Sequence, residues 1–256
     1  MISVAHLGSR PLSRRCLQLM HNHEDVNVAA VVTYPENHDG WWEGSLRELA
    51  DDLDYPVVET ESLYNFDLDY LISTLYYDIL EEELLEHPSH GGLNLHQAEL
   101  PRYRGSNSFS HAIMNAREDN YWKYGTTLHF MNKKVDQGDI VARKFVDVTE
   151  DDTAKSLYNK TEDASVELFK DVLPEIVSGE VDEMRTPQSE FDGPTYFYNK
   201  DSLKNKKYVD PARLGSEDTQ QQVYDTIRAV NFPPFEPAHT ELNGETIYLT
   251  TDYNYE

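Results

Sequence analysis

The sequence predicts an α/β fold: a Rossmann-like, mostly parallel sheet with helices on both faces, followed by a small mixed C-terminal appendage. Short apolar runs alternate with segments of helical periodicity through residues 1–180, the pattern expected of strands in one parallel sheet. Beyond Gly179 the pattern is irregular and prolines are frequent. Hydrophobic residues make up 39% of the chain, enough for a sizeable core. We therefore expect a main domain over 1–180 and a small region over 181–256.

The first elements follow from the spacing of apolar residues. The run VNVAAVVT at 26–33 is continuous and rich in valine, as expected of a strand that is buried on both faces. The other strands are expected at 2–7, 56–59, 68–75 and 92–96, and the helices between them at 12–20, 45–53 and 79–85.

The later elements continue the alternation. A long amphipathic helix over 152–178 should begin with an acidic first turn, which suits the positive end of the helix dipole. A helix is expected before it at 108–115, and strands at 126–131 and 141–148. In the C-terminal region only a helix near 217–230 and a strand at 246–250 are expected.

The charge of the chain restricts its partners. Twenty-two basic and 47 acidic residues leave a net charge of −25, which argues against nucleic acid because phosphate binding needs clustered Lys and Arg. A solvated acidic shell favours a halophilic source. The single cysteine, Cys16, fits a reducing compartment, and no segment is apolar enough for a signal peptide or a membrane span. We expect a cytoplasmic protein without a membrane partner.

The charge is also uneven along the chain. Residues 91–143 hold seven basic and five acidic residues, a net charge of +2 against −27 for the rest. Such a region favours an anionic ligand, and chance clustering of surface lysines is the alternative. A second basic group either meets a pyrophosphate or is merely exposed; it comprises Lys200, Lys204, Lys206 and Lys207.

Two common phosphate-binding patterns are missing. The first strand-to-helix turn, Gly8-Ser9-Arg10-Pro11, has one glycine where a dinucleotide fold needs three, and no P-loop pattern is present. A nicotinamide dehydrogenase is therefore disfavoured.

Asn94 and His96 are the first candidates for chemistry. They are two residues apart on a predicted strand, so both side chains point to one face near its carboxyl end, where open α/β sheets bind ligands. An amide beside an imidazole suits acyl transfer to nitrogen, in which an oxyanion is stabilised and the amine loses a proton. Asp136, in a glycine-containing loop, can pair with His96 and favour its charged form. From spacing alone, ordinary hydrogen bonding of this Asn-x-His pair remains the alternative.

Other polar residues give weaker signals. No Cys/His or His/His pair has convincing metal-ligand spacing, so no metal is expected. His111 and His129 are interpreted as structural or exposed.

Longer motifs strengthen the chemical interpretation. Three linked segments resemble the folate-dependent formyltransferases: NLHxxxLPRYRG at 94–105, GTTLHFM at 125–131 and VDxGDI at 135–140. That family includes methionyl-tRNA formyltransferase, glycinamide ribonucleotide formyltransferase and the sugar-nucleotide N-formyltransferases. The resemblance covers roughly residues 1–180, and the invariant Asn, His and Asp of the family fall on Asn94, His96 and Asp136.

The resemblance implies a donor and a mechanism. The donor would be 10-formyltetrahydrofolate, and no metal would be needed. Asn94 and protonated His96 would stabilise the oxyanion, while Asp136 keeps His96 charged and takes the amine's proton through a water. The folate would contact two segments: Leu75, Tyr76, Tyr77, Asp78, Ile79 and Leu80, and then Lys133, Lys134, Val135 and Gly138.

Two segments look most like the sugar-nucleotide branch of the family. They are SNSFSHAI at 106–113 and IRAVNFPPFEPA at 227–238, although the second could by itself be a turn with buried aromatics. The implied acceptor is a nucleotide-linked amino sugar, either dTDP-4-amino-4,6-dideoxyglucose or a 3-amino isomer. Its expected contacts are Arg102, Tyr103, Arg104, Asn107, Tyr196, Arg228, Phe232 and Phe235. A homodimer through the C-terminal region is also expected.

Three alternatives stay open at this stage. One is an atypical methionyl-tRNA formyltransferase, although that enzyme usually carries a larger basic C-terminal domain. The others are a formyltetrahydrofolate hydrolase and an inactive folate-binding protein.

The acidic shell leads to a stability prediction. At low ionic strength the net charge of −25 repels itself, and salt screens this repulsion. We expect the melting temperature to rise from low to molar salt in a thermal unfolding series. A flat or falling melting temperature would contradict a halophilic adaptation.

Overall fold

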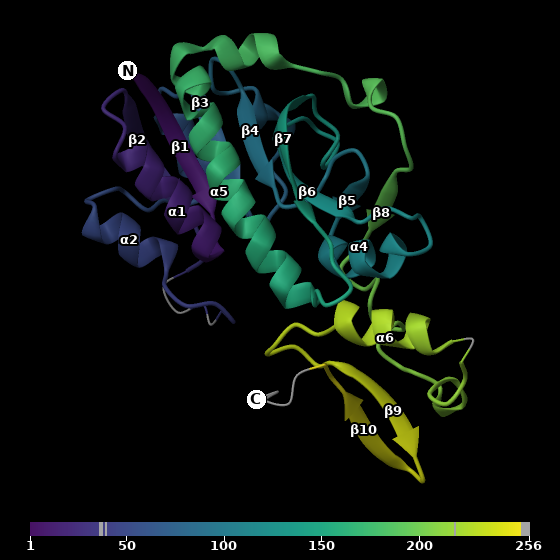
Figure 1. Cartoon of the computed structure of the whole chain (residues 1–256). Coiled ribbons are helices and arrows are strands. Elements are labelled where there is room, and N and C mark those ends of the chain that lie inside the picture. The colour runs from purple at the N-terminus through teal and green to yellow at the C-terminus, as the bar shows by residue number, and fades with distance from the viewer. Residues whose placement is uncertain (36–37, 39, 218, 252–256) are drawn as a thin grey trace.

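The computed structural model describes residues 1–35, 38, 40–217 and 219–251. Its centre is a six-stranded sheet with the order β2-β1-β3-β4-β6-β7 (Figure 1). The strands are β1 (Ile2–Gly8), β2 (Val26–Val32), β3 (Tyr70–Thr74), β4 (Gly92–His96), β6 (Lys123–Phe130) and β7 (Ile140–Asp147). The first four in spatial order run parallel, whereas β6 is antiparallel to both β4 and β7. The expected α/β class is confirmed.

Helices cover both faces of the sheet, as predicted. One face carries α1 (Arg10–His21), α2 (Leu46–Asp52) and the long α5 (Ala154–Ser178), whose apolar residues form the largest core cluster with the strands (Figure 1). The other face is covered more thinly, by a 3-10 helix at Thr60–Asn65 and the single turn α3 (Glu82–Leu85). The parallel strands are almost continuously buried, which explains their unbroken apolar runs.

The C-terminal region is tied to the main domain. Short 3-10 helices at Glu180–Met184 and Gln188–Glu190 lead to β8 (Tyr196–Tyr198), which pairs in parallel with β5 (Tyr103–Gly105). A further 3-10 turn at Pro211–Arg213 precedes α6 (Gln220–Ala229), which packs on α4 (Ser108–Ala116). The chain ends in a hairpin of β9 (Ala238–Leu242) and β10 (Glu245–Leu249), which extends away from the main sheet (Figure 1). The division at residue 180 stays a prediction.

Several expected elements differ in the structure. The strand at 56–59 is only an isolated bridge between Val31 and Val57. The helix at 79–85 shortens to α3, because the consecutive glutamates from Glu81 onward favour a helix start there rather than at Ile79. The long helix begins after the N-cap Thr153 and has no acid in its first turn, since Asp152 lies before the cap. The helix expected at 217–230 is α6, and residue 218 lies outside the described part. The short strands β5, β8 and β9 were not expected.

Candidate active site

The structure brings Asn94, His96 and Asp136 together. Asn94 and His96 lie on β4, and Asp136 comes from the loop that connects β6 to β7. The Asp136 Oδ1 atom lies 3.7 Å from His96 Nδ1, and the Oδ2 atom accepts a hydrogen bond of 2.9 Å from the Gly105 amide. The His96 side chain is 14% exposed, so the pair is largely shielded from solvent but still accessible. This geometry is the one that the sequence pattern anticipated.

Both ring nitrogens of His96 face hydrogen-bond acceptors. Besides the carboxylate at Nδ1, the carbonyl oxygen of Tyr103 lies 3.2 Å from Nε2. The Tyr103 carbonyl is within hydrogen-bond distance of Nε2, whereas the 3.7 Å between Nδ1 and the carboxylate is an ion-pair distance, longer than a hydrogen bond. The ring is therefore oriented by a carbonyl on one side and lies beside a carboxylate on the other.

The Asp136 carboxyl is held in its charged form. Burial by itself would raise its pKa, but the charge of His96 and the hydrogen bond from the Gly105 amide outweigh that effect, so the pKa is lowered. His129 and Arg104 add to the same effect. Asp136 also has a positive φ of 57°, a conformation that few non-glycine residues adopt.

Gln188 fixes the loop that carries Asp136. Its side-chain nitrogen donates to the carbonyl oxygens of Asp136 and Gly138, each at 2.9 Å, while its oxygen accepts from Arg104 at 2.7 Å. Gln188 is buried and belongs to the linker beyond residue 180. The C-terminal region therefore contributes directly to the position of the carboxylate.

His129 supports Asn94 from the neighbouring strand. Burial, assisted by the charge of His96, lowers the pKa of His129 to about 4, so its ring is neutral near pH 7. With Nδ1 donating to the Phe130 carbonyl at 2.7 Å, Nε2 accepts from the Asn94 amide nitrogen at 3.1 Å. This orients the amide of Asn94, and its second N–H has no other partner among the described residues. The sequence pattern predicts no place for His129 in the site.

The predicted folate residues lie on two neighbouring segments. A groove of about 420 Å³ runs between α3 and the loop after β6, and its lining includes Lys133 and Lys134. The ion pair between Lys133 and Glu82, at 3.2 Å, connects the two sides. Gly138 lies deeper, where the loop folds back on Phe130.

The segment before α3 contributes exposed apolar surface. Ile79 is 74% exposed and Tyr77 is 38% exposed, and on the loop after β6 Val135 is 46% exposed. Large apolar side chains left in water suit contact with the flat face of a ring system such as a pteridine. The remaining predicted residues make internal contacts: the Tyr76 hydroxyl bonds Thr60, Asp78 accepts from the Ile79 amide, Leu80 packs in the core, and Leu75 has a positive φ of 55°.

Most of the polar residues that were predicted to bind the substrate form contacts with other residues inside the protein. Arg102 is buried and forms an ion pair of 2.6 Å with Asp119, which also accepts from Tyr196 at 2.9 Å. Tyr103 is 1% exposed and stacks on Tyr196. Neither Arg102 nor Tyr103 offers a free surface to a phosphate.

Arg228 is the clearest correction among these residues. It is completely buried, pairs with Asp225 at 2.9 Å and donates to the carbonyl oxygens of Thr149 and Asp152. It holds α6 against the start of α5 and cannot reach a ligand. Asn107, at the start of α4, likewise donates to the segment around Ser202.

Phe232 and Phe235 occupy a different place. Both lie against Trp41, with ring centroids 4.9 Å and 6.0 Å away, and Phe232 also contacts Tyr158 at 5.4 Å. Phe235 is 48% exposed. Phe235 thus keeps about half of its surface in contact with solvent, whereas Phe232 and Tyr196 are half-buried.

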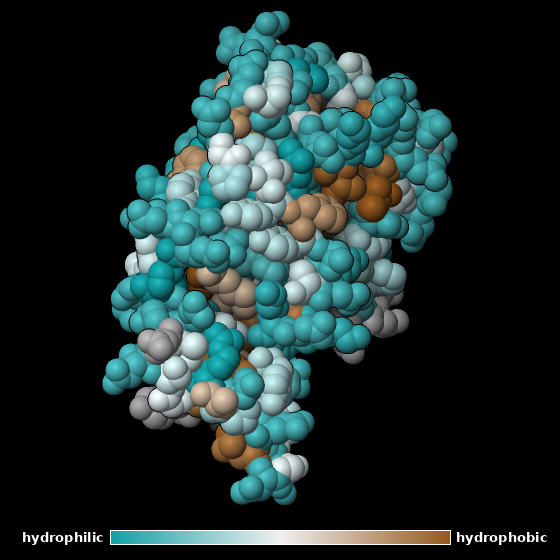
Figure 2. Space-filling model, turned by 90° about the vertical axis from the view of Figure 1, so that its right-hand side faces the viewer, coloured by the Kyte–Doolittle hydropathy of each residue, from teal (hydrophilic) through white to brown (hydrophobic). Residues whose placement is uncertain are grey.

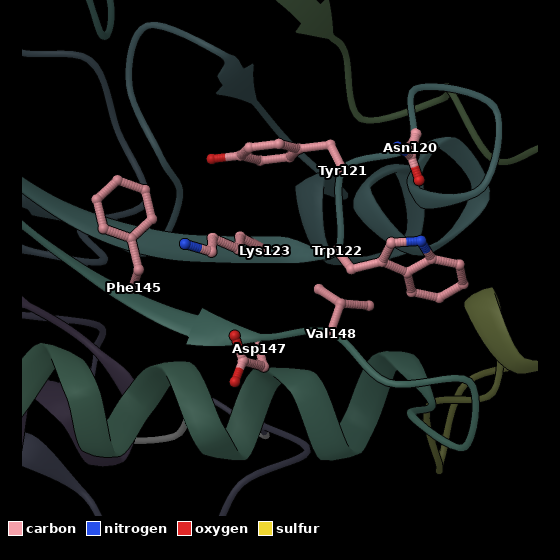
Figure 3. Close-up of a pocket in the computed structure, with 7 residues that line it drawn as sticks. All are labelled: Asn120, Tyr121, Trp122, Lys123, Phe145, Asp147 and Val148. Carbon is pink, nitrogen blue, oxygen red and sulfur yellow. The ribbon is translucent and has the colours of Figure 1, made fainter.

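A second hollow, of about 560 Å³, lies at the start of β6 and the end of β7 (Figure 3). It is lined by Asn120, Tyr121, Trp122, Lys123, Phe145, Asp147 and Val148, and none of the catalytic candidates is among them. We therefore place the chemistry at Asn94, His96 and Asp136, where the acid–base groups converge.

Two structural features are absent from the described part of the chain. No group of three or more His, Cys, Asp or Glu side chains there is arranged to hold a metal ion. In the same residues, no helix is both long and apolar enough to cross a bilayer.

A mostly parallel sheet with Asn94, His96 and Asp136 gathered beside β4 suits acyl transfer, and comparison with known proteins gives the family. The family model described as formyl transferase matches residues 8–173. The chain belongs to this family and is therefore a formyltransferase.

The individual relatives are of two kinds, methionyl-tRNA formyltransferases and other N-formyltransferases. A methionyl-tRNA formyltransferase of Halalkalibacterium halodurans is 28% identical over 254 residues, covering 94% of this chain and 74% of the relative. A 4-N formyltransferase from Francisella tularensis has a TM-score of 0.77 at 17% identity, covering 97% of this chain and 96% of that protein.

Two more structures extend the comparison. An N-formyltransferase from Helicobacter canadensis, in complex with folinic acid and dTDP-3-aminofucose, has a TM-score of 0.73 at 20% identity and covers 95% and 85% of the two chains. For a methionyl-tRNA formyltransferase from Clostridium thermocellum the TM-score is 0.60 at 15% identity, with coverage of 98% and 92%.

We predict that His96→Ala and Asp136→Ala each lower turnover at least about a hundredfold, the usual scale for loss of an acid–base or oxyanion group. Folding should survive, because the two residues lie at a strand end and in a loop. Formyl transfer measured beside thermal unfolding tests this, with the exposed His21→Ala as control. Near-normal turnover of the His96 variant would refute the assigned role.

Proposed function

We propose that the protein is an N-formyltransferase that formylates the amine of a nucleotide-linked amino sugar, with 10-formyltetrahydrofolate as the donor. The acceptor that fits this proposal is dTDP-4-amino-4,6-dideoxyglucose or a 3-amino isomer. The single observation that carries the proposal is the likeness of the whole chain, C-terminal region included, to sugar N-formyltransferases, with TM-scores of 0.73 to 0.77. We place the enzyme in the cytoplasm.

The rival acceptor is methionyl-tRNA, because the curated relatives carry that name. Two observations favour the sugar nucleotide. The TM-score to a methionyl-tRNA formyltransferase is 0.60, and a net charge of −25 opposes a broad tRNA surface. Moreover, the chain covers 74% of the Halalkalibacterium relative but 96% of the Francisella enzyme.

In this proposal each member of the site has a task. The acceptor nitrogen forms a bond to the formyl carbon, the bond from that carbon to the donor nitrogen breaks, and the amine's proton passes to the donor nitrogen. The free N–H of Asn94 and the imidazolium of His96 stabilise the oxyanion. Asp136, charged and shielded, keeps His96 in that form, accepts the amine's proton through a water and passes it on to the departing donor nitrogen.

The decisive experiment incubates the protein with 10-formyltetrahydrofolate and separate acceptors. These are dTDP-linked 4-amino and 3-amino dideoxy sugars, a UDP-linked amino sugar, and methionyl-tRNA. We expect a mass increase of one formyl group on an amino-sugar nucleotide and none on methionyl-tRNA, with His96→Ala as the inactive control. Formylation of methionyl-tRNA alone would overturn the proposal, and release of formate without an acceptor would indicate a hydrolase.

We also propose that two copies pair through the terminal hairpin. Leu242, Ile247 and Tyr248 on β9 and β10 are 47%, 42% and 57% exposed. Figure 2 shows a small hydrophobic patch at the lower tip of this face, at the height of the hairpin in Figure 1, besides a larger one at its upper right. A small two-stranded sheet with apolar side chains in water gains stability from a second copy.

Light scattering after size-exclusion chromatography tests this pairing. We expect a dimer for the natural chain and a monomer for Ile247→Lys combined with Tyr248→Ser. Phe145→Ser, which alters an exposed aromatic residue away from the hairpin, is the control. A monomeric natural chain would contradict the proposal.

A further inference from the structure

Arg10 and Lys155 are cations that meet at one tryptophan. Arg10 is the first residue of α1, just after β1, and Lys155 lies in the first turn of α5. The guanidinium lies 5.7 Å from the ring centroid of Trp41 and 5.6 Å from that of Trp42. The ammonium of Lys155 lies 4.6 Å from the Trp41 centroid. The Trp41 ring therefore sits between two positive charges.

Neither cation forms an ion pair with the described residues. The Nε atom of Arg10 is buried and has no hydrogen-bond partner there. Burial lowers the pKa of Lys155, and the charge of Glu162 raises it by a smaller amount. In a chain with 47 acidic residues, two sheltered cations that have no carboxylate partner among the described residues point to an anion that comes from outside.

The two cations also stand at the ligand-binding edge of the sheet. The strand order changes direction between β1 and β3, and the Ser9 hydroxyl joins their carboxyl ends by donating to the Leu75 carbonyl at 2.6 Å. Open α/β sheets bind ligands at this switch point. Arg10 follows directly and has a positive φ of 67°, a conformation unfavourable for arginine that the surrounding contacts must maintain.

The distance between Arg10 and the catalytic candidate His96 suits the proposed acceptor. His96 ends β4, and Arg10 follows β1, which is two strands away in the sheet. Neighbouring strands are about 4.8 Å apart, so the two strand ends are separated by roughly 10 Å. A hexose with its diphosphate can bridge that span.

Aromatic side chains from the C-terminal region lie beside the two cations and Trp41. Phe232 and Phe235 both contact Trp41, and Lys155 lies 5.0 Å from the Phe232 ring centroid. The half-exposed Phe235 leaves part of this aromatic surface open. A flat nucleobase stacks on such a surface, while the phosphates require the cations.

We propose that Arg10 and Lys155 bind the diphosphate of a nucleoside diphosphate, and that Trp41, Phe232 and Phe235 form the wall for its base. The inference rests on the proposed function, because this nucleoside diphosphate belongs to the acceptor. This site takes the place of Arg102 and Arg228 among the predicted substrate-binding residues, because the side chains of those two arginines are engaged inside the protein.

Calorimetric titration with free dTDP and with inorganic pyrophosphate tests the site without turnover. Arg10→Gln and Lys155→Gln should each weaken dTDP and pyrophosphate binding by about tenfold to a hundredfold, the scale for one charge-assisted contact. Trp41→Ala should weaken dTDP binding but leave pyrophosphate binding within about threefold, because only the base needs the ring. Binding of 5-formyltetrahydrofolate should stay within about twofold in all three variants.

Lys170→Gln is the matched control, since it removes one exposed positive charge from the same helix as Lys155. Lys204→Gln examines the rival basic group in the C-terminal region. Unchanged dTDP affinity in the Arg10 and Lys155 variants would overturn the proposal, as would a larger loss in the Lys204 variant. Thermal unfolding of each variant confirms that it is folded.

The two proposals can fail separately. If amino-sugar nucleotides are formylated but Arg10→Gln keeps the natural acceptor KM, the diphosphate site is wrong and the proposed function stands. If no sugar nucleotide is formylated but dTDP binding is lost in Arg10→Gln, the site stands and the proposed acceptor is wrong.

Discussion

The position of the Asp136 carboxylate in the candidate active site depends on one close backbone approach. At Gly138 a Cβ atom would lie 1.7 Å from the carbonyl oxygen of Phe130, so only glycine lets the loop after β6 fold back on the strand it has just left. That reversal carries Asp136 to His96 instead of away from the sheet. The positive φ of Asp136 is part of the same turn and is maintained by the contacts around it.

The same loop makes the C-terminal region part of the candidate active site. Gln188 joins the carbonyls of Asp136 and Gly138 to Arg104, and β8 lies against β5, where a Cβ on Gly105 would be 2.2 Å from the Tyr198 carbonyl. The amide of Gly105 in turn binds the Asp136 carboxylate. A change in the C-terminal region can therefore reach the reacting centre through the backbone, without any contact to the acceptor.

The sequence predicted most of the sheet and all three catalytic candidates, because buried strands and an Asn-x-His pair are encoded locally. It failed where tertiary partners decide the role of a residue. An arginine next to a motif suggests a phosphate ligand. In the structure, however, Arg102 pairs with Asp119 and Arg228 pairs with Asp225. The spacing of residues in the sequence does not reveal these ion pairs. His129 was missed for the same reason. Its pairing with Asn94 becomes visible only when β6 is aligned antiparallel to β4.

An anionic substrate poses a particular difficulty for a chain with a net charge of −25. Long-range attraction cannot recruit it, so the necessary positive charge has to act at short range in a place of low dielectric. A carboxylate partner would neutralise each cation, whereas an aromatic ring shields it from water and leaves its charge available. The contacts of Arg10 and Lys155 with Trp41 have that character. The acidic surface and the two cations are thus compatible. The surface charge acts at long range through solvent, whereas the cations act only on a ligand that touches them.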